Sequence, residues 1–436
     1  MMTVFVLDIL LLIILLILGL PIVFCFSGAL LFFALFFKLH FVSLLLWGFS
    51  KITNPVLLCI PLFILAGGIM SKSGISDALL DFVNLFIGRI KGGLGLVAII
   101  TCGIIGAISG SSATGVSAIG PILMPRMVKE GYSRGYSTAL VTCSSVLGLL
   151  IPPSILMIIY GWTTGTSILA CFLATIGPGL LIILFFSITN LISVRKMPLI
   201  LQQQSPLGFK ENMKKKLNTT YIAIPALLMP VIILGGIYGG VFTPGEAAGV
   251  AAVISIPIGF LIYRGLKIKT FLEIVKESGT ITGSIMIQIF MALILSQVFV
   301  MFRIPQELIN FIYNITSNKL LILFIINIFL FLQGCVMDDC TSMILSSALM
   351  FPMIKELGIN PIHFAAILGT NLAMGNLTPP FAPLLYLGMR VCKVEFIEIF
   401  KPTLVFIIFG YLPVVIITTY WPALSLFLPR LLGYTF

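Results

Sequence analysis

About ten apolar segments, each long enough to cross a bilayer as a helix, make up most of this chain. A transmembrane helix needs about 20 consecutive apolar residues, and 59% of the 436 residues are hydrophobic while 9% are charged. Soluble domains carry about 25% charged residues, so the composition predicts an all-α polytopic membrane protein. The expected spans are residues 3–20, 22–37, 54–70, 136–160, 171–193, 219–240, 245–263, 281–300, 360–386 and 400–422.

Two further apolar stretches, at about 94–126 and 320–352, carry small polar residues at their centres. The centre of the first reads GSSATG (110–115), and that of the second reads VMDDCTS (336–342). Non-helical backbone at bilayer depth is tolerated only where protein buries it or where it lines a cavity. Both stretches are therefore predicted to be re-entrant hairpins that enter and leave on one side of the membrane. The alternative for the first stretch is a small-residue face for helix packing.

The two predicted hairpins belong to an internal repeat. Residues 109–161 align with 336–388 without a gap, and nine of the 53 positions are identical. Six of those nine are glycine or proline, residues that mark backbone shape rather than general hydrophobicity. The chain is therefore expected to hold a first repeat at 1–194 and a second at 219–436.

A double proline interrupts an apolar helix at the same aligned place in each repeat. The sequences are GLLIPPS at 148–154 and GNLTPPF at 375–381, within helices expected at about 136–160 and 360–386. Two successive prolines remove two amide donors and break a helix. Each repeat is thus predicted to pair one broken helix with one hairpin. A proline kink that binds no ion is the alternative.

The basic residues predict the orientation. The one long polar segment, 195–218, carries six Lys or Arg and one Glu, and the positive-inside rule makes it a cytoplasmic linker. If each hairpin returns to its own side, 19 of the 25 basic residues lie inside and 6 outside. The two repeats are then inverted, and both termini are periplasmic. This bias also explains the net charge of +11 without a nucleic-acid partner.

Inverted repeats with broken helices are how many secondary transporters build a site at the bilayer midplane. Carbonyl groups freed at a break, and the C-termini of half-helices, suit sodium ions. One cation site is expected where the first hairpin meets the first break, and another where the second hairpin meets the second break. The candidate cation ligands are Ser109, Gly110, Ser111, Ser112, Gly148, Ile151 and Pro153 at the first site, and Val336, Asp338, Thr341, Gly375, Thr378 and Pro380 at the second.

Four polar residues near these two sites are candidates to line a substrate site, although a packing role fits each of them as well. They are Ser144, Ser145, Asn371 and Asn376. Asp338 and Asp339 form an adjacent acidic pair, and acids inside a membrane are functional candidates, whereas a tip that reaches water would leave the pair merely solvated. The eight cysteines are scattered, without a C-x-x-C pair, so sodium is expected and a transition-metal site is not.

Several motifs resemble the large membrane subunit of tripartite ATP-independent periplasmic (TRAP) transporters. They are GAISGSSATG, GLLIPPSILMIIYG, GNLTPP, FTPGEAAGVAAV and the closing YWPALSLFLP, and the resemblance runs almost from end to end. It implies an inverted-repeat, elevator-type importer in the bacterial inner membrane, driven by sodium and carrying small organic acids such as C4-dicarboxylates or sialic acid. It also implies a small four-helix membrane subunit and a periplasmic binding protein that delivers the solute.

The resemblance implies a transporter rather than an enzyme, with sodium as the coupling ion and no other cofactor. Two other functions stay open at this point. A stand-alone sodium-coupled organic anion symporter of related elevator architecture would show the same repeats and hairpins, and dependence on a binding protein separates the two. The second of these other functions is that of a channel or of a membrane enzyme that acts on a lipid. Such an enzyme would need ionisable groups that converge at one depth, and the sequence offers only Asp338 and Asp339.

Overall fold

Residues 2–37, 39–88, 90–199 and 209–434 are described by the computed structural model, and every regular element within them is helical. Eight helical segments are long and apolar enough to cross a membrane, as expected for an all-α polytopic membrane protein.

The first half contains α1 (Met2–Ile17), α2 (Ile22–Phe36), α3 (Phe41–Ile52), η1 (Pro55–Leu58), α4 (Cys59–Lys72), α5 (Ile75–Ile87), α6 (Gly93–Ser109), α7 (Ser112–Lys129), α8 (Arg134–Ser145), α9 (Leu147–Leu150), α10 (Ile155–Thr164) and α11 (Ile168–Val194). The second half contains α12 (Phe209–Tyr238), α13 (Pro244–Pro257), η2 (Ile258–Ile262), α14 (Ile268–Met301), α15 (Ile304–Ile315), α16 (Lys319–Val336), α17 (Asp339–Glu356), α18 (Pro361–Gly375), α19 (Pro383–Cys392), α20 (Phe396–Val405), η3 (Phe406–Tyr411), α21 (Leu412–Tyr420) and α22 (Pro422–Leu431).

The apolar pattern predicts most spans but not all of their bounds. Helix α14 is 34 residues long, whereas only its second half, 281–300, is apolar enough to be expected as a span. Helix α3 is not among the expected spans, because its 12 residues are too few to cross a bilayer. The last expected span, 400–422, is a helix that passes through the π-helical segment η3 between α20 and α21.

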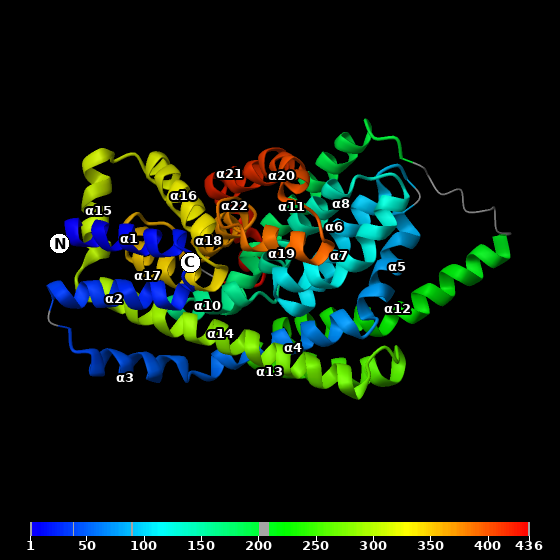
Figure 1. Ribbon diagram of the computed structural model, residues 1–436, viewed down its shortest axis with the longest axis horizontal. Helices are drawn as coiled ribbons and strands as arrows, with labels where there is room; N and C mark the ends of the chain where they lie inside the picture. The colour runs from blue at the N-terminus through cyan, green and yellow to red at the C-terminus, as the bar shows by residue number, and fades with distance from the viewer. Residues whose placement is uncertain (1, 38, 89, 200–208, 435–436) are drawn as a thin grey trace.

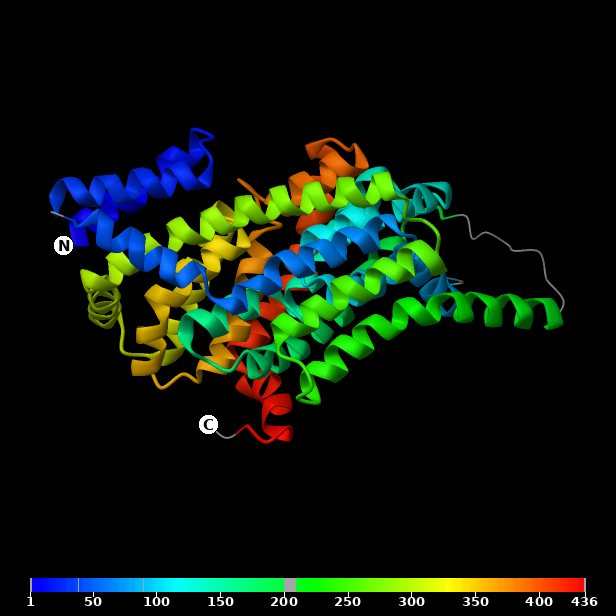
Figure 2. The same ribbon diagram turned by 90° about the horizontal axis from the view of Figure 1, so that it is seen from below.

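The last part of the predicted linker, 195–218, is helical in the structure. Residues 200–208 lie outside the described part of the chain, and the stretch that follows, 209–218, already forms the first turns of α12. Lysine, glutamate and methionine are good helix formers, and the stretch KENMKKKL consists mostly of them. Helix α12 therefore extends well past its apolar part, away from the other helices (Figure 2).

The register that aligns Ser109 with Val336 also relates the helices of the two halves. It carries both ends of α7 onto those of α17, and it carries α6 onto α16 within one residue. Helices α8 and α10 likewise correspond to α18 and α19, α5 corresponds to α15, and α11 corresponds to the run from α20 to α21. The same order of helix, turn, helix and broken helix therefore occurs twice.

The two halves pack reciprocally around the centre of the molecule. Helix α7 of the first hairpin packs on α19 beyond the second break, and α17 of the second hairpin packs on α10 beyond the first break. Helices α4 and α14 pack on each other and run along one side of these central helices (Figure 1). Such exchanged contacts suit a two-fold relation between the repeats. The inversion of the repeats relative to the bilayer stays a prediction.

Candidate transport site

The tip of the first hairpin lies against the first helix break. Gly110 ends α6 with a left-handed φ of 63°, and Ser111 is extended before α7 begins. A Cβ atom on Gly110 would lie 2.7 Å from the Pro153 carbonyl oxygen, so the position requires glycine for space as well as for its φ angle. The Ile155 amide donates to the Gly110 carbonyl at 3.4 Å. The structure therefore brings the first set of predicted residues together.

The first break also approaches the hairpin from its other side. A Cβ atom on Gly148 would lie 2.6 Å from the Ser111 carbonyl oxygen. Pro152 and Pro153 cannot supply the amide donors that the Gly148 and Leu149 carbonyls would have in a continuous helix. The Ser154 hydroxyl donates to the Leu149 carbonyl at 2.5 Å. The Leu149 carbonyl thus has a substitute donor, and the Gly148 carbonyl, next to the hairpin tip, lacks the amide donor of a continuous helix.

The second hairpin meets the second break in a similar way. The Phe381 amide donates to the Cys335 carbonyl at 3.3 Å, and a Cβ atom on Gly334 would lie 3.1 Å from the Gly375 Cα atom. The Thr378 hydroxyl donates to the Met374 carbonyl at 3.0 Å, which leaves the lone pairs of its oxygen for another partner. The second set of predicted residues is therefore also assembled at one place.

Asp338 caps the N-terminus of α17. One of its carboxylate oxygens accepts hydrogen bonds from the amides of Cys340 at 3.1 Å and Thr341 at 3.4 Å, and the other accepts from the Thr341 hydroxyl. Aspartate is among the preferred residues at this position. Ser111, which holds the equivalent position before α7, makes no capping hydrogen bond with its side chain. The two hairpin tips are thus alike in backbone and different in chemistry.

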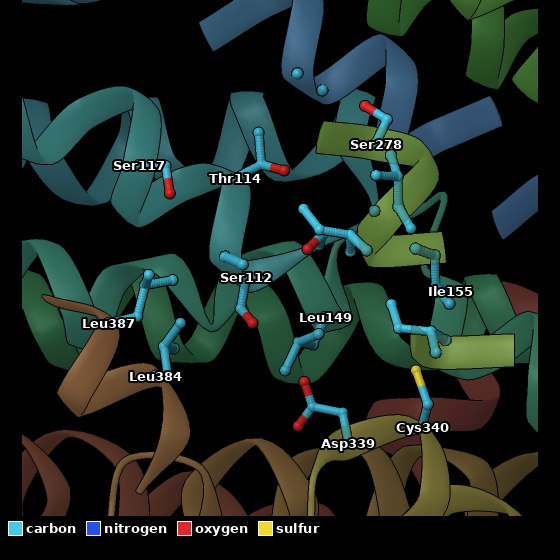
Figure 3. A pocket seen from close by; sticks show the side chains of 18 of the residues that line it. Ser112, Thr114, Ser117, Leu149, Ile155, Ser278, Asp339, Cys340, Leu384 and Leu387 are labelled. Atoms are coloured by element: carbon cyan, nitrogen blue, oxygen red, sulfur yellow. The ribbon is translucent and has the colours of Figure 1, made fainter. Parts of the chain in front are cut away.

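A cavity of about 440 Å³ lies between the two tips and the α4–α14 pair. Five of the predicted site residues line it, and Asp339 lines it with them. Figure 3 shows the Asp339 carboxylate pointing from the second hairpin toward Leu149 and Ser112 of the first half. The predicted residues at its surface are Gly110, Ser111, Ser112, Asp338 and Asn376. The other predicted cation ligands are not in the lining.

Three of the four predicted substrate residues are absent from the cavity lining. The hydroxyls of Ser144 and Ser145 donate to helix carbonyls at 2.7 and 2.8 Å. The side-chain amide of Asn371 donates to the side-chain oxygen of Asn327 at 2.7 Å. These residues are buried, and their contacts are those of helix packing. Asn376 does line the cavity, and its side-chain amide donates to the Asp339 carboxylate.

The opposite wall of the cavity was missed by sequence reasoning. Its polar residues come from α4 and α14, and Lys72 and Glu277 form an ion pair of 2.8 Å between these helices. Gln288 interrupts the apolar part of α14, and Ser278 lies just before it; the polar residue within the apolar run was the available signal. Among the described residues, no group of three or more His, Cys, Asp or Glu side chains could hold a metal ion.

With this geometry in hand, comparison with known proteins decides the family. A family model described as "Tripartite ATP-independent periplasmic transporter, DctM component" matches residues 9–424. The chain belongs to this family. It is a multi-pass large permease of the TRAP type, and such a permease works with a small membrane subunit and a periplasmic binding protein.

The names of the relatives of this TRAP permease specify different solutes. The chain is 35% identical over 391 residues to the C4-dicarboxylate TRAP transporter large permease DctM of Pseudomonas aeruginosa, with 90% of each chain covered. It is 33% identical over 372 residues to the ectoine TRAP transporter large permease TeaC of Halomonas elongata, covering 85% of this chain and 86% of that one. The crystal structure of the YdaH transporter of Alcanivorax borkumensis shares the fold, with a TM-score of 0.57, 14% identity, and 88% and 89% of the two chains covered.

Proposed function

We propose that this TRAP permease imports a small organic acid, a dicarboxylate or a sialic-acid-like compound, across the bacterial inner membrane by sodium-coupled elevator motion. The observation that carries the proposal is the cavity between two hairpin tips, each of which abuts a proline break. Its volume lies within the range of small-molecule sites, about 300–1,000 Å³. Sodium is carried with the solute, so it is a second substrate rather than a resident cofactor.

The first sodium ion binds between the first tip and the first break. Gly148 lies against the Ser111 carbonyl, and Pro152 deprives the Gly148 carbonyl of its usual helix donor. Hard cations prefer oxygen ligands, and broken transporter helices supply them from the backbone. The second ion binds in the same way beside Thr378, whose hydroxyl oxygen keeps free lone pairs.

The carboxylate of the solute binds at the N-terminus of α7. Ser111 does not cap this helix with its side chain, so the amides of the first turn keep unsatisfied donors. Helix N-termini also carry a partial positive charge that favours anions. The hydroxyls of Ser112, Thr114 and Ser117 lie along the same side of the cavity (Figure 3) and add further donors.

The hairpins and broken helices move together past α4 and α14. The exchanged packing of α7 on α19 and of α17 on α10 ties the central helices into one body. The cavity lies between that body and the α4–α14 pair, which is where an elevator motion would expose and cover a bound solute. The small subunit has four helices, and both termini of this chain lie in the periplasm.

Solute uptake into proteoliposomes tests this function. They contain this chain with its small subunit, and uptake is measured with and without an inward sodium gradient and with and without the binding protein. Uptake that needs both supports the proposal. Uptake with sodium alone assigns the chain to the stand-alone organic anion symporters, and uptake that needs no sodium overturns the coupling.

A further inference from the structure

The charges around the cavity do not suit a purely anionic solute. Among the described residues of its lining, Lys72 is the one cation, and Glu277, Asp338 and Asp339 are the anions. Lys72 is already paired with Glu277 at 2.8 Å. Both oxygens of Asp338 accept hydrogen bonds at the N-terminus of α17, where the helix dipole stabilises a negative charge. Asp339 is the carboxylate that lacks a cationic partner.

Asn376 supplies a second observation at the same point. Its side-chain nitrogen donates to the Asp339 carboxylate, and its side-chain oxygen has no hydrogen-bond partner in the described part of the chain. The residue is 4% exposed and lines the cavity. A buried amide oxygen without a donor is costly, typically by about 1–3 kcal/mol. Asn376 therefore holds the Asp339 carboxylate through its side-chain nitrogen, while its side-chain oxygen is buried, so Asp339 is the acceptor that the second tip directs into the cavity.

We infer that the transported solute carries a positively charged nitrogen that binds the Asp339 carboxylate. An ammonium or amidinium group supplies a positive charge together with N–H donors, so it can form a charge-assisted hydrogen bond to this carboxylate. The solute is then a zwitterion, with its carboxylate at the uncapped N-terminus of α7 and its cationic nitrogen at the start of α17. This inference rests on the transport role of the proposed function, and it replaces the dicarboxylate or sialic-acid-like solute named there by a zwitterionic organic acid.

The two ends of such a solute match the difference between the two tips. Ser112 and Asp339 are equivalent in the repeat, since they share the register that aligns Ser109 with Val336. The first tip presents hydroxyls and helix amides, whereas the second presents the Asp339 carboxylate. A dicarboxylate would place one of its anionic ends beside Asp339. Like charges that face each other in a confined site are strongly unfavourable.

Thermal stabilisation by matched ligands, measured on this chain purified together with its small subunit, tests the inference. The probes are 4-aminobutanoate and succinate, together with the corresponding three-, five- and six-carbon pairs, in saturating sodium and in sodium-free buffer. Each pair differs in having an ammonium group where the diacid has a second carboxylate. We expect apparent affinities for the zwitterions to exceed those for the diacids by about tenfold or more, the scale of a charge-assisted hydrogen bond.

Asp339→Asn is the decisive variant, because it keeps the size and the contact with Asn376 while removing the charge. We expect it to abolish the preference for zwitterions, whereas Glu307→Gln, at an exposed position on α15, keeps it. Diacids that bind as well as zwitterions, a preference that survives Asp339→Asn, or no response to either series each overturns the inference. Zwitterion binding that is equally strong with and without sodium supports the inference about the solute, and it contradicts the sodium coupling of the proposed function.

Discussion

Ser112 and Asp339 occupy equivalent positions at the starts of α7 and α17 and line the same cavity from two different hairpins (Figure 3). The backbone around them follows one plan, because each hairpin tip abuts a glycine and a proline break. The side chains at the tips differ, since one tip carries serines and the other carries two aspartates. The repeat thus provides the frame of the site, and the departures from the repeat make its two ends chemically different.

Loss of a hydroxyl at either predicted cation site should lower the affinity of the transporter for sodium. Ser111→Ala and Thr378→Ala each remove one oxygen from a proposed shell. We expect the sodium concentration for half-maximal uptake to rise about three- to tenfold, as for the loss of one hydrogen-bond-strength contact of about 1 kcal/mol. The measurement is uptake against sodium concentration in proteoliposomes.

Ser187→Ala is the matched control for these two variants. Its hydroxyl donates to a helix carbonyl at 2.6 Å in α11, away from both tips. Sodium dependence that is unchanged in Ser111→Ala and Thr378→Ala, or shifted as much in Ser187→Ala, would count against the assignment of the sites.

The close approach of Gly148 to the first hairpin predicts that Gly148→Ala disrupts transport. The new Cβ atom would lie 2.6 Å from the Ser111 carbonyl oxygen, which is backbone and cannot move without displacing the tip. Overpacking of this kind costs about 1–3 kcal/mol, so we expect transport to fall by about tenfold or more. Gly235→Ala is the control, because nothing lies within 4 Å of its Cβ position. Equal activity of the two variants would contradict the packing of tip and break.

Two substitutions at Asp338 separate its structural contribution, as the cap of α17, from the contribution of its charge to sodium binding. Asp338→Ala removes acceptors from the amides of Cys340 and Thr341 and should destabilise the protein by about 1 kcal/mol. Asp338→Asn keeps a good capping residue and should unfold near the wild-type temperature while losing sodium affinity. Thermal unfolding and sodium titration distinguish the two effects. A stability loss in Asp338→Asn as large as in Asp338→Ala would disprove the separation.

Glycine and proline explain why so much of this frame is predictable from the sequence. Both residues act through their own backbone geometry, so the turn at Gly110 and the breaks at Pro152 and Pro379 are local properties. The gapless alignment of the two repeats then extends each local signal to a second place in the chain. For this reason the two hairpins and the two broken helices appear at the predicted positions.

The chemistry of the second tip is harder to predict from sequence. Which of the adjacent acids Asp338 and Asp339 caps α17 depends on the first helical residue, and helix bounds are uncertain by one or two positions. Sequence analysis named Asp338 among the candidate cation ligands; in the structure its carboxylate caps α17, and the carboxylate of Asp339 points into the cavity that both residues line. Similarly, the wall formed by α4 and α14 depends on packing between helices from different halves of the chain, which no local pattern encodes.

The contact between α4 and the first hairpin predicts a conformational effect of Gly67→Ala. A Cβ atom at Gly67 would lie 2.9 Å from the Ser109 Cβ atom and 2.9 Å from the Thr114 hydroxyl oxygen. If the hairpins move past α4, this clash exists only while the two surfaces are apposed, so the substitution should favour the separated state. A shift of about 1 kcal/mol changes a two-state ratio about fivefold.

Thiol labelling of the cavity measures that shift. The probe is Ser117→Cys, which lines the cavity, in a Cys340→Ser background because Cys340 lines it too, while all eight native cysteines are buried. We expect Gly67→Ala to raise the labelling rate several-fold by a membrane-impermeant reagent. Gly249→Ala is the control, since its Cβ position is 3.9 Å from Leu62 of α4 and makes only an ordinary contact. A labelling rate that Gly67→Ala leaves unchanged would show that α4 and the first hairpin stay together, and the elevator motion would then need another boundary.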